Sequence, residues 1–541
     1  MRTERNSRTW ALALLCIVLP ALSGTVRGRT LYVDDDATPP GDGSSWTTAF
    51  RYLQDAIAAT SAGDEIWVAQ GVYRPDQAHQ VVEGDRRATF LLNDGVAILG
   101  GFAGVGTADP DLRDPDRFAT LLSGDLAGDD DTGDPLAWYN NSFSIVMAPA
   151  VGSDTVLDGL TICHAYVADG HGGGLRNDGG SPLLRHCTFR DNLASDGDAG
   201  VYNDKGSLRI EYCRFLRNSG EDSGALCNHQ GSVEVIASEF IENDSEQSAA
   251  AAYNEEGDMV LFACLFRGNR GEDGRGSVWN LGDLRLLHCT FIENGGRGGA
   301  VTCTDGQAVI ANCLFCRNTG EMAGALYVES TSVHLDQCTL YANVSTDGHA
   351  GAVYCRPAVS SSALTRPAGS FQALSCIVWA NGARDELDGD ELMTGYTHQI
   401  GGDPNGATLE YCGVQGWTPD RGGVGNIGID PLFVAPDQND FHLKSQAGHW
   451  DTVALAWVAD DITSPCIDAG DPNSPLGQEP FPNGGRVNMG VYGGTCEASK
   501  SWFAVAPGAG IDAADLNGDG RVDAEDLRLA ILRRSPMVAP E

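Results

Sequence analysis

Apolar and polar residues follow a pattern that repeats about every 25 residues between Leu160 and Val414. Each repeat approximates Gly-Ala-aliphatic-aromatic-Asn, then Gly-x-apolar-x-apolar, then Cys-x-Phe-x-x-Asn. Within a repeat the apolar residues alternate over three short segments, which is the periodicity of β-strands rather than of helices. Three short strands per repeat, each followed by a bend, predict an all-β parallel β-helix whose regular part covers 160–416.

One column of the repeat is occupied by cysteine. It holds Cys187, Cys213, Cys264, Cys289, Cys313, Cys338, Cys376 and Cys412, with Ser238 in one copy. Stacked strands lie about 4.8 Å apart with parallel Cβ vectors, which is poor geometry for a disulfide. We therefore expect buried thiols that pack as small apolar groups, with bridges as the alternative. Cys466 and Cys496, outside the column, are better candidates for a disulfide.

Two further columns consist of asparagine. One holds Asn192, Asn218, Asn243, Asn269, Asn294, Asn318, Asn343 and Asn381, and the other holds Asn177, Asn203, Asn228, Asn254 and Asn280. Stacked amide side chains can hydrogen-bond to one another along the axis of a β-stack. Both columns are therefore predicted to be structural ladders rather than catalytic groups.

The segments before the repeats have different patterns. Residues 1–23 place three arginines before an apolar run that is too short to span a membrane, with small residues near its end, which is typical of a secretory signal peptide. In 30–159, Leu53, Ala56 and Ile57 share one helical face. We expect a short helix here that covers the open N-terminal end of the solenoid, together with irregular first rungs.

The segments that interrupt or follow the repeats lack the period of about 25 residues, and their structures are predicted from its absence. The insertions at 356–370 and 382–404 are expected to project as loops. Residues 417–497 are expected to form irregular last rungs that close the solenoid, and 498–541 are expected to form a separate small module.

The composition narrows the functional classes. The 541 residues include 74 Asp or Glu and 35 Lys or Arg, for a formal charge of −39. Such a field repels nucleic-acid phosphates and anionic lipid surfaces and attracts cations, Ca²⁺ above all. Because no later segment has the length of a transmembrane helix, the signal peptide predicts a secreted or cell-surface protein.

A calcium-binding motif lies near the C-terminus. Asp515, Asn517 and Asp519 offer side-chain oxygens at positions 1, 3 and 5 of a twelve-residue loop, and Gly520 permits its sharp turn. A helix-forming segment follows. The predicted Ca²⁺ ligands are Asp515, Asn517, Asp519, Arg521 through its carbonyl, Asp523 and Asp526.

Acidic residues also gather in the loop before each Gly-Ala element. They are Asp196, Asp198, Glu221, Asp222, Glu246, Glu272, Asp273, Glu321 and Asp347. Stacked carboxylates repel unless a cation lies among them, so this column is either a calcium or sugar site or a solvated edge. Arg275 and Arg297 are candidate bases or charge partners, and His164, His171 and His186 show no metal-ligand spacing.

These repeats resemble known families. The alternation of Gly224-Ala225-Leu226 with Phe240 and Asn243 is similar to polymorphic outer-membrane protein repeats. From about residue 30 to 495 the chain also resembles exported right-handed parallel β-helix proteins of the pectate-lyase-like superfamily. This resemblance implies the fold; for function it implies lyases, hydrolases and non-catalytic adhesins alike.

The terminal loop resembles a dockerin repeat, an EF-hand-like calcium module that docks onto cohesin domains. Aspartate at the twelfth position, Asp526, is part of that resemblance. A complete dockerin has two such loops and this sequence has one copy, so a cohesin partner stays an open alternative.

The sequence therefore predicts a secreted or cell-surface calcium-binding β-helix that acts as a non-catalytic scaffold for polysaccharide binding or adhesion. The alternative is a polysaccharide lyase or glycoside hydrolase that acts on acidic polysaccharide. An enzyme should bring two or three carboxylates and a basic residue together in a concave groove, whereas a scaffold should leave its acids splayed.

Overall fold

The computed structural model describes residues 28–79, 81–132, 134, 136–271, 275–360, 365–385, 389–403 and 405–502. The predicted signal peptide and the predicted calcium ligands from Asp515 to Asp526 lie outside these residues. Within them, no helix has both the length and the apolar character needed to cross a membrane.

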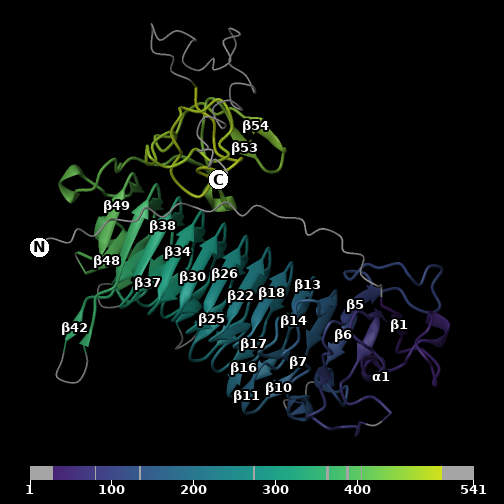
Figure 1. Ribbon diagram of the computed structural model, residues 1–541. Helices are drawn as coiled ribbons and strands as arrows, with labels where there is room; N and C mark the ends of the chain where they lie inside the picture. Colours follow the sequence, from purple (N-terminus) through teal and green to yellow (C-terminus); the bar gives the residue numbers. More distant parts are fainter. Residues whose placement is uncertain are drawn as a thin grey trace, which may run out of the picture.

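The repeats form a parallel β-helix, as predicted (Figure 1). Its four faces are sheets of 13, 12, 11 and 10 strands, which we name sheets A, B, C and D. One turn runs through all four faces, so each repeat contains one short strand more than the three that were predicted. This turn consists of β21 (Leu226–His229) in sheet C, β22 (Ser232–Ile236) in sheet A, β23 (Glu239–Ile241) in sheet B and β24 (Asp244–Ser245) in sheet D.

Sheet C runs along one face of the solenoid. Its middle strands pair in parallel with each side chain opposite its counterpart in the next turn. In spatial order its strands are β4 (Phe90–Leu91), β7 (Val146–Pro149), β12 (Leu175–Asp178), β17 (Val201–Asp204), β21, β25 (Ala249–Glu255), β29 (Gly276–Asn280), β33 (Val301–Cys303), β37 (Leu326–Val328), β41 (Val353–Cys355) and β48 (Ile400–Gly402).

Stacked columns fill the interior. Six phenylalanines stack face to face with centroids 4.5 to 5.2 Å apart and interplanar angles of 3° to 10°. The first asparagine column is a continuous chain of side-chain hydrogen bonds from Asn192 to Asn381, which confirms the predicted ladder. The second column is likewise linked from Asn177 to Asn280.

The cysteine column is buried, and every cysteine in the described residues is a free thiol, as expected for the column. The expectation of a disulfide at Cys466 or Cys496 is corrected. Cys466 is buried against Ile467 and Met489, whereas Cys496 is exposed, so the two thiols lie in different environments.

The bend between sheets A and B places a non-glycine residue in the left-handed region in turn after turn. Tyr212 and Ala237 have φ of 54° and 47°. This conformation costs about 1 kcal/mol per residue. The conformation persists because each bend residue still hydrogen-bonds to the next turn. The Tyr212 N–H donates to the Ile236 carbonyl at 2.9 Å, and the Ala237 N–H donates to the Phe262 carbonyl at 2.8 Å.

At the N-terminal end, α1 (Leu53–Ala58) buries Leu53, Ala56 and Ile57 in the main core. It lies beside β1 (Thr30–Val33) and β2 (Glu65–Ala69), the first strands of sheet A (Figure 1). The predicted helix is present; its role as a cap stays a prediction.

Both predicted insertions contain antiparallel hairpins. In 356–370, β42 (Val359–Ser360) pairs with β43 (Thr365–Arg366) and projects from the solenoid (Figure 1). In 382–404, β46 (Gly382–Asp385) pairs with β47 (Gly389–Met393), followed by α2 (Tyr396–Gln399). This second segment is only partly a loop, because β46 extends sheet D, β48 extends sheet C and Asn381 continues its ladder to Gln399.

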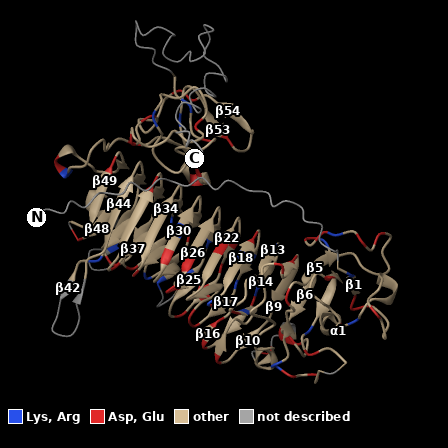
Figure 2. Cartoon of the chain, in the orientation of Figure 1, with Lys and Arg blue, Asp and Glu red and all other residues tan. Residues whose placement is uncertain are grey.

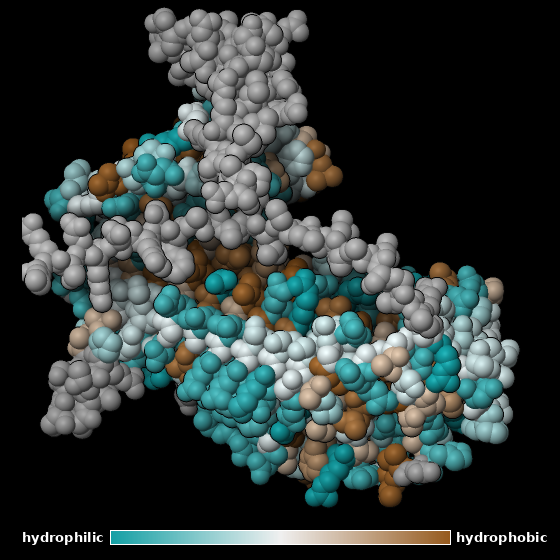
Figure 3. Space-filling model, in the orientation of Figure 1, coloured by the Kyte–Doolittle hydropathy of each residue, from teal (hydrophilic) through white to brown (hydrophobic). Residues whose placement is uncertain are grey.

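The sequence predicts last rungs over 417–497, but the structure places a compact unit there instead. Its strands form two antiparallel pairs, β51 (Phe433–Ala435) with β52 (Asp440–Leu443) and β53 (His449–Asp451) with β54 (Ala456–Val458). We call residues 427–502 the C-terminal unit. Its apolar residues pack on Ile292, Leu314 and Ile377 of the outer face of sheet B. Figure 3 shows apolar surface on the solenoid beside this unit.

Candidate functional site

A row of mostly aromatic side chains runs along the outer face of sheet C. It arises from the aliphatic-aromatic-Asn motif, because the aliphatic residue and the asparagine point into the core and the residue between them points outward. The row pairs in register from turn to turn. We call it the aromatic row; it consists of Tyr202, Cys227, Tyr253, Trp279, Thr302, Tyr327 and Tyr354.

Cysteine interrupts the rings near the start of the row. His171 stacks on Tyr202 with ring centroids 4.6 Å apart, and Tyr253 stacks on Trp279 at 4.8 Å. Between these two stacks the row holds only the small side chain of Cys227. Two strand spacings separate Tyr202 from Tyr253 by about 10 Å, and Cys227 between them is only 2% exposed.

A buried carboxylate lies beside Cys227. Asp198 is 2% exposed, and its Oδ2 lies 2.7 Å from Nδ1 of His171. The Cys227 thiol also forms a side-chain hydrogen bond with Asp198, whose Oδ1 is buried from solvent. Burial raises the pKa of Asp198 against the hydrogen bond from His171, which lowers it. The same hydrogen bond raises the pKa of His171.

Two short strands bring these groups together. β11 (Gly170–His171) and β16 (Gly197–Asp198) pair in parallel, with His171 opposite Asp198. Gly197 has φ +113°, and a Cβ at this position would lie 1.8 Å from the Gly170 carbonyl oxygen. Glycine is therefore required for the strand pairing that forms the dyad.

Together these groups line a pocket of about 390 Å³, which we call the sheet C pocket. It contains three carboxylates and two imidazoles among aromatic rings. The lining residues are His171, Asp198, Tyr202, Asp222, Cys227, His229, Ser248, Tyr253, Glu255 and Trp279. The set offers general acid and base groups and hydrogen-bond acceptors beside apolar ring surfaces.

The predicted acidic column divides into two groups. Asp198 and Asp222 converge in the sheet C pocket. The remaining described members lie at the edge, where acidic residues are frequent along turns and loops (Figure 2). Of these, Asp196, Glu246, Glu321 and Asp347 are exposed and Glu221 is partly exposed, while Glu272 and Asp273 lie outside the described residues. The solvated-edge interpretation thus holds for most of the column.

The two candidate arginines have acidic partners. Arg297 lies 3.8 Å from Glu321, and Arg275 lies 3.5 Å from the fully buried Glu329. The Arg275 guanidinium also lies over the Trp279 ring, 5.3 Å from its centroid. Glu329 forms a second ion pair with Arg356. These contacts favour charge pairing over the role of a catalytic base.

His171 and the tyrosines of the aromatic row are functional candidates that sequence reasoning missed. His171 precedes Asp198 by 27 residues, which is one turn of the repeat. The histidine therefore falls in register with the acidic column, and that register is the signal that could have identified it. His164 and His186, by contrast, contact Trp138 and Tyr212 at ring distances of 5.6 and 5.4 Å.

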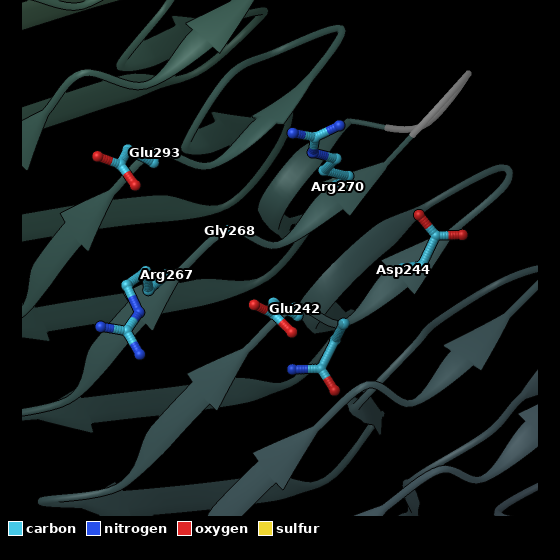
Figure 4. Close-up of a pocket in the computed structure, with 7 residues that line it drawn as sticks. Glu242, Asp244, Arg267, Gly268, Arg270 and Glu293 are labelled. Carbon is cyan, nitrogen blue, oxygen red and sulfur yellow. The ribbon is translucent and has the colours of Figure 1, made fainter.

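A second pocket of about 650 Å³ lies on the turns between sheets B and D (Figure 4). Glu242, Asp244 and Glu293 line it together with Arg267 and Arg270. Gly268 occupies the place where Arg217 and Arg317 stand in other turns. No aromatic ring lines this pocket, and two guanidinium groups offset two of its three carboxylates.

Two acidic triads have carboxylate oxygens within 4.8 Å of one another. They are Asp34, Asp35 and Asp36, and Asp125, Asp129 and Asp130. Such oxygens suit Ca²⁺. In each triad, however, one carboxylate already accepts a backbone N–H of a loop. Asp34 accepts that of Val105 and Asp125 that of Gly128, each at 2.7 Å.

Comparisons with known proteins give limited matches. A family model described as "Disaggregatase related" matches residues 411–470. A search of curated proteins finds no match.

Among solved structures, a pectate lyase titled Pel9A is 12% identical with a TM-score of 0.42, covering 86% of this chain and 97% of its own. A rhamnogalacturonan lyase is 14% identical with a TM-score of 0.41, covering 81% and 97%. A complex of XylC with xylose is 10% identical with a TM-score of 0.35, covering 75% and 87%. These values are too low to transfer an activity to this chain.

Proposed function

We propose that this protein is a secreted or cell-surface β-helix that binds a polysaccharide along the outer face of sheet C. The observation that supports this most is the sheet C pocket, where the partly exposed carboxylates of Asp222 and Glu255 lie among aromatic rings. Saccharides present both C–H surfaces that pack on rings and hydroxyls that need acceptors. The aromatic row continues over successive turns, with Trp279 and Tyr354 partly exposed.

Replacing a ring of the row tests this proposal. Tyr253→Ala should weaken glycan binding about tenfold, because the variant loses one wall of the pocket. The measurement is binding of the intact protein to a glycan array, followed by calorimetry with the strongest ligand. Tyr212→Ala, which changes an exposed tyrosine away from sheet C, serves as the control. A parent protein that binds no glycan would overturn the proposal.

A second candidate function is catalysis by a polysaccharide lyase or glycoside hydrolase. The convergence of Asp198, Asp222 and Glu255 with histidines in one pocket favours it, because it approaches the arrangement expected of an enzyme. The assay incubates each bound glycan with the protein, with and without Ca²⁺, and detects new reducing or unsaturated ends. New chain ends that the parent produces and Asp222→Asn does not would establish the enzyme. Glycans that stay intact would support the binding protein.

We also propose that the terminal loop binds Ca²⁺ through Asp515, Asn517, Asp519, Arg521, Asp523 and Asp526. The double variant Asp515→Ala/Asp519→Ala removes two carboxylate ligands and should lose Ca²⁺ affinity by a factor of 100 or more, on the order of 3 kcal/mol. Calorimetric titration with Ca²⁺ measures it. A double variant that binds Ca²⁺ as tightly as the parent would remove the assignment, and with it the grounds for a cohesin-type partner.

A further inference from the structure

Buried oxygen atoms without hydrogen-bond partners gather in the loop between β6 (Thr120–Ser123) and β7. They are Oδ1 of Asp130, Oδ1 of Asn140 and Oδ1 of Asn141, none of which has a partner among the described residues. Asn141 is 0% exposed. Because a buried acceptor without a donor is destabilising, three such oxygens in one loop point to a shared electropositive partner.

The same loop holds an acidic triad. Carboxylate oxygens of Asp125, Asp129 and Asp130 lie within 4.8 Å of one another. Ca²⁺ binds oxygens at about 2.3–2.6 Å, so two ligands on opposite sides of one ion lie about 5 Å apart. The triad is therefore compact enough for its carboxylates to share a single ion. The other triad, Asp34 to Asp36, has no buried unpartnered oxygen in the part of the chain that the structure describes.

Two asparagine side chains are directed at this triad. Nδ2 of Asn140 donates to both oxygens of Asp129 at 3.2 Å, and Nδ2 of Asn141 donates to Asp130 Oδ2 at 2.8 Å. Oδ1 belongs to the same planar amide group as Nδ2, so both unpartnered amide oxygens lie next to the carboxylates. Carboxylate and amide oxygens are ligands that Ca²⁺ takes in proteins.

Short helices bring these side chains together. The 3₁₀ helix η2 (Asp130–Thr132) packs beside the 3₁₀ helix η3 (Ala137–Asn140). At the base of the loop the Ser142 N–H donates to the Gly124 carbonyl at 2.8 Å. The loop therefore returns on itself, and the two asparagines at its end meet the acidic residues at its start.

The triad lacks a cationic side chain to offset its charge. Within the described part of the chain, none of its carboxylates forms an ion pair with arginine, lysine or histidine. Arg74 and Arg86 bind backbone instead, donating through Nε to the carbonyls of Asp125 and Asn141, each at 2.6 Å. Burial raises the pKa of Asp130 against the hydrogen bond from Asn141, and the charge of Asp125 raises it further. A bound cation would offset this repulsion.

The burial of the unpartnered oxygens fits an ion rather than a docked molecule. A dehydrated ion holds its oxygens closer than the about 2.8 Å of a hydrogen bond to water, so oxygens set around it are closed to water. Asp129 and Asp130 are partly exposed, which gives an ion a route from solvent.

We propose that the loop between β6 and β7 binds one Ca²⁺ ion through the carboxylates of Asp125, Asp129 and Asp130 and the amide oxygens of Asn140 and Asn141. The site is separate from the terminal loop and from the sheet C pocket. It stands independently of polysaccharide binding.

The test uses the full chain carrying Asp515→Ala/Asp519→Ala, so that the terminal loop does not contribute. The probe is Tb³⁺, which takes oxygen ligands as Ca²⁺ does and emits when a nearby tryptophan is excited. Trp138 lies in the same 3₁₀ helix as Asn140. Excitation should therefore produce Tb³⁺ emission that Ca²⁺ displaces, and Trp138→Phe should remove most of that emission.

Variants of the triad identify the ligands. Asp129→Asn and Asp130→Asn each remove a ligand charge while preserving side-chain shape, and each should weaken Ca²⁺ affinity at least about tenfold in the displacement assay. Asp134→Asn removes the same charge at an exposed position of the same loop and should leave the affinity unchanged. Circular dichroism checks that each variant keeps the β-helix.

Three results would overturn the inference. They are the absence of Tb³⁺ emission, emission that Ca²⁺ does not displace, and a loss of affinity in Asp134→Asn as large as in both triad variants. The first two would mean that water satisfies the buried oxygens, and the third that overall charge attracts the ion.

Discussion

Glu479 illustrates how strongly a single buried residue can be perturbed in this protein. It is 6% exposed within the C-terminal unit, and its Oε1 accepts the N–H groups of Asn488 at 2.7 Å and Gly494 at 2.9 Å. Its Oε2 has no hydrogen-bond partner among the described residues. Burial raises the pKa of Glu479 to about 7, against those two hydrogen bonds, and Asp468 raises it further.

This shift predicts that the stability of the C-terminal unit depends on pH. Because the folded state holds the proton more tightly, the stabilisation is fully present below pH 4.5 and is lost as pH rises through about 7. The change approaches ~3 kcal/mol. This change in stability is measured by thermal unfolding, with hydrogen exchange of residues 427–502 as the readout. Glu479→Gln keeps Oε1 and removes the charge, so it should be the more stable protein at pH 8. A parent as stable at pH 8 as at pH 5 would contradict this.

Between elements, the turns are joined by side chains that repeat in register. Asn243 shows the pattern at the bend between β23 and β24. Its Nδ2 donates to the Phe215 carbonyl and to Asn269 Oδ1, each at 2.9 Å, and its Oδ1 accepts from the N–H and Nδ2 of Asn218, each at 3.0 Å. One side chain thus bridges three successive turns.

Removing it should destabilise the solenoid. Asn243→Ala leaves the backbone N–H of Asn218 and one N–H of its side-chain amide buried without partners, at a cost of about 3 kcal/mol or more. The expected result is a lower urea midpoint. Asn473→Ala, which changes an exposed asparagine hydrogen-bonded only to Asp471, is the matched control. Equal midpoints for the two variants would show that the ladder adds little stability.

At the scale of the whole molecule, the C-terminal unit folds back onto the side of the solenoid. Phe441 is 1% exposed and packs with Ile377 and Met489 in the interface with sheet B. Asn312, at a bend of the solenoid, donates to the carbonyls of Val491 at 3.0 Å and Gly493 at 2.9 Å. The interface covers the part of the outer face of sheet B that holds Ile292, Leu314 and Ile377.

Phe441→Ala should loosen this interface without unfolding the solenoid. The cavity costs about 3–5 kcal/mol, confined to contacts between the unit and sheet B. Hydrogen exchange should rise in 427–502 while protection in the solenoid is retained. Phe240→Ala, in the central stack, should instead lower protection across neighbouring turns. Loss of protection throughout the solenoid in Phe441→Ala would contradict a separable unit.

The sequence alone determined the parallel β-helix, the buried cysteine column and both asparagine ladders. In a solenoid, residues one repeat apart are neighbours in space, so a column in the sequence is a column in the fold. It also placed Asp198 and Asp222 in one acidic column. The tertiary structure decided the rest: that His171 bonds to Asp198, that Cys227 lies buried between Tyr202 and Tyr253, and that 427–502 packs on sheet B instead of extending the rungs. These contacts depend on side-chain direction and on partners outside the period, such as Asn312 and Val491, which repetition does not encode.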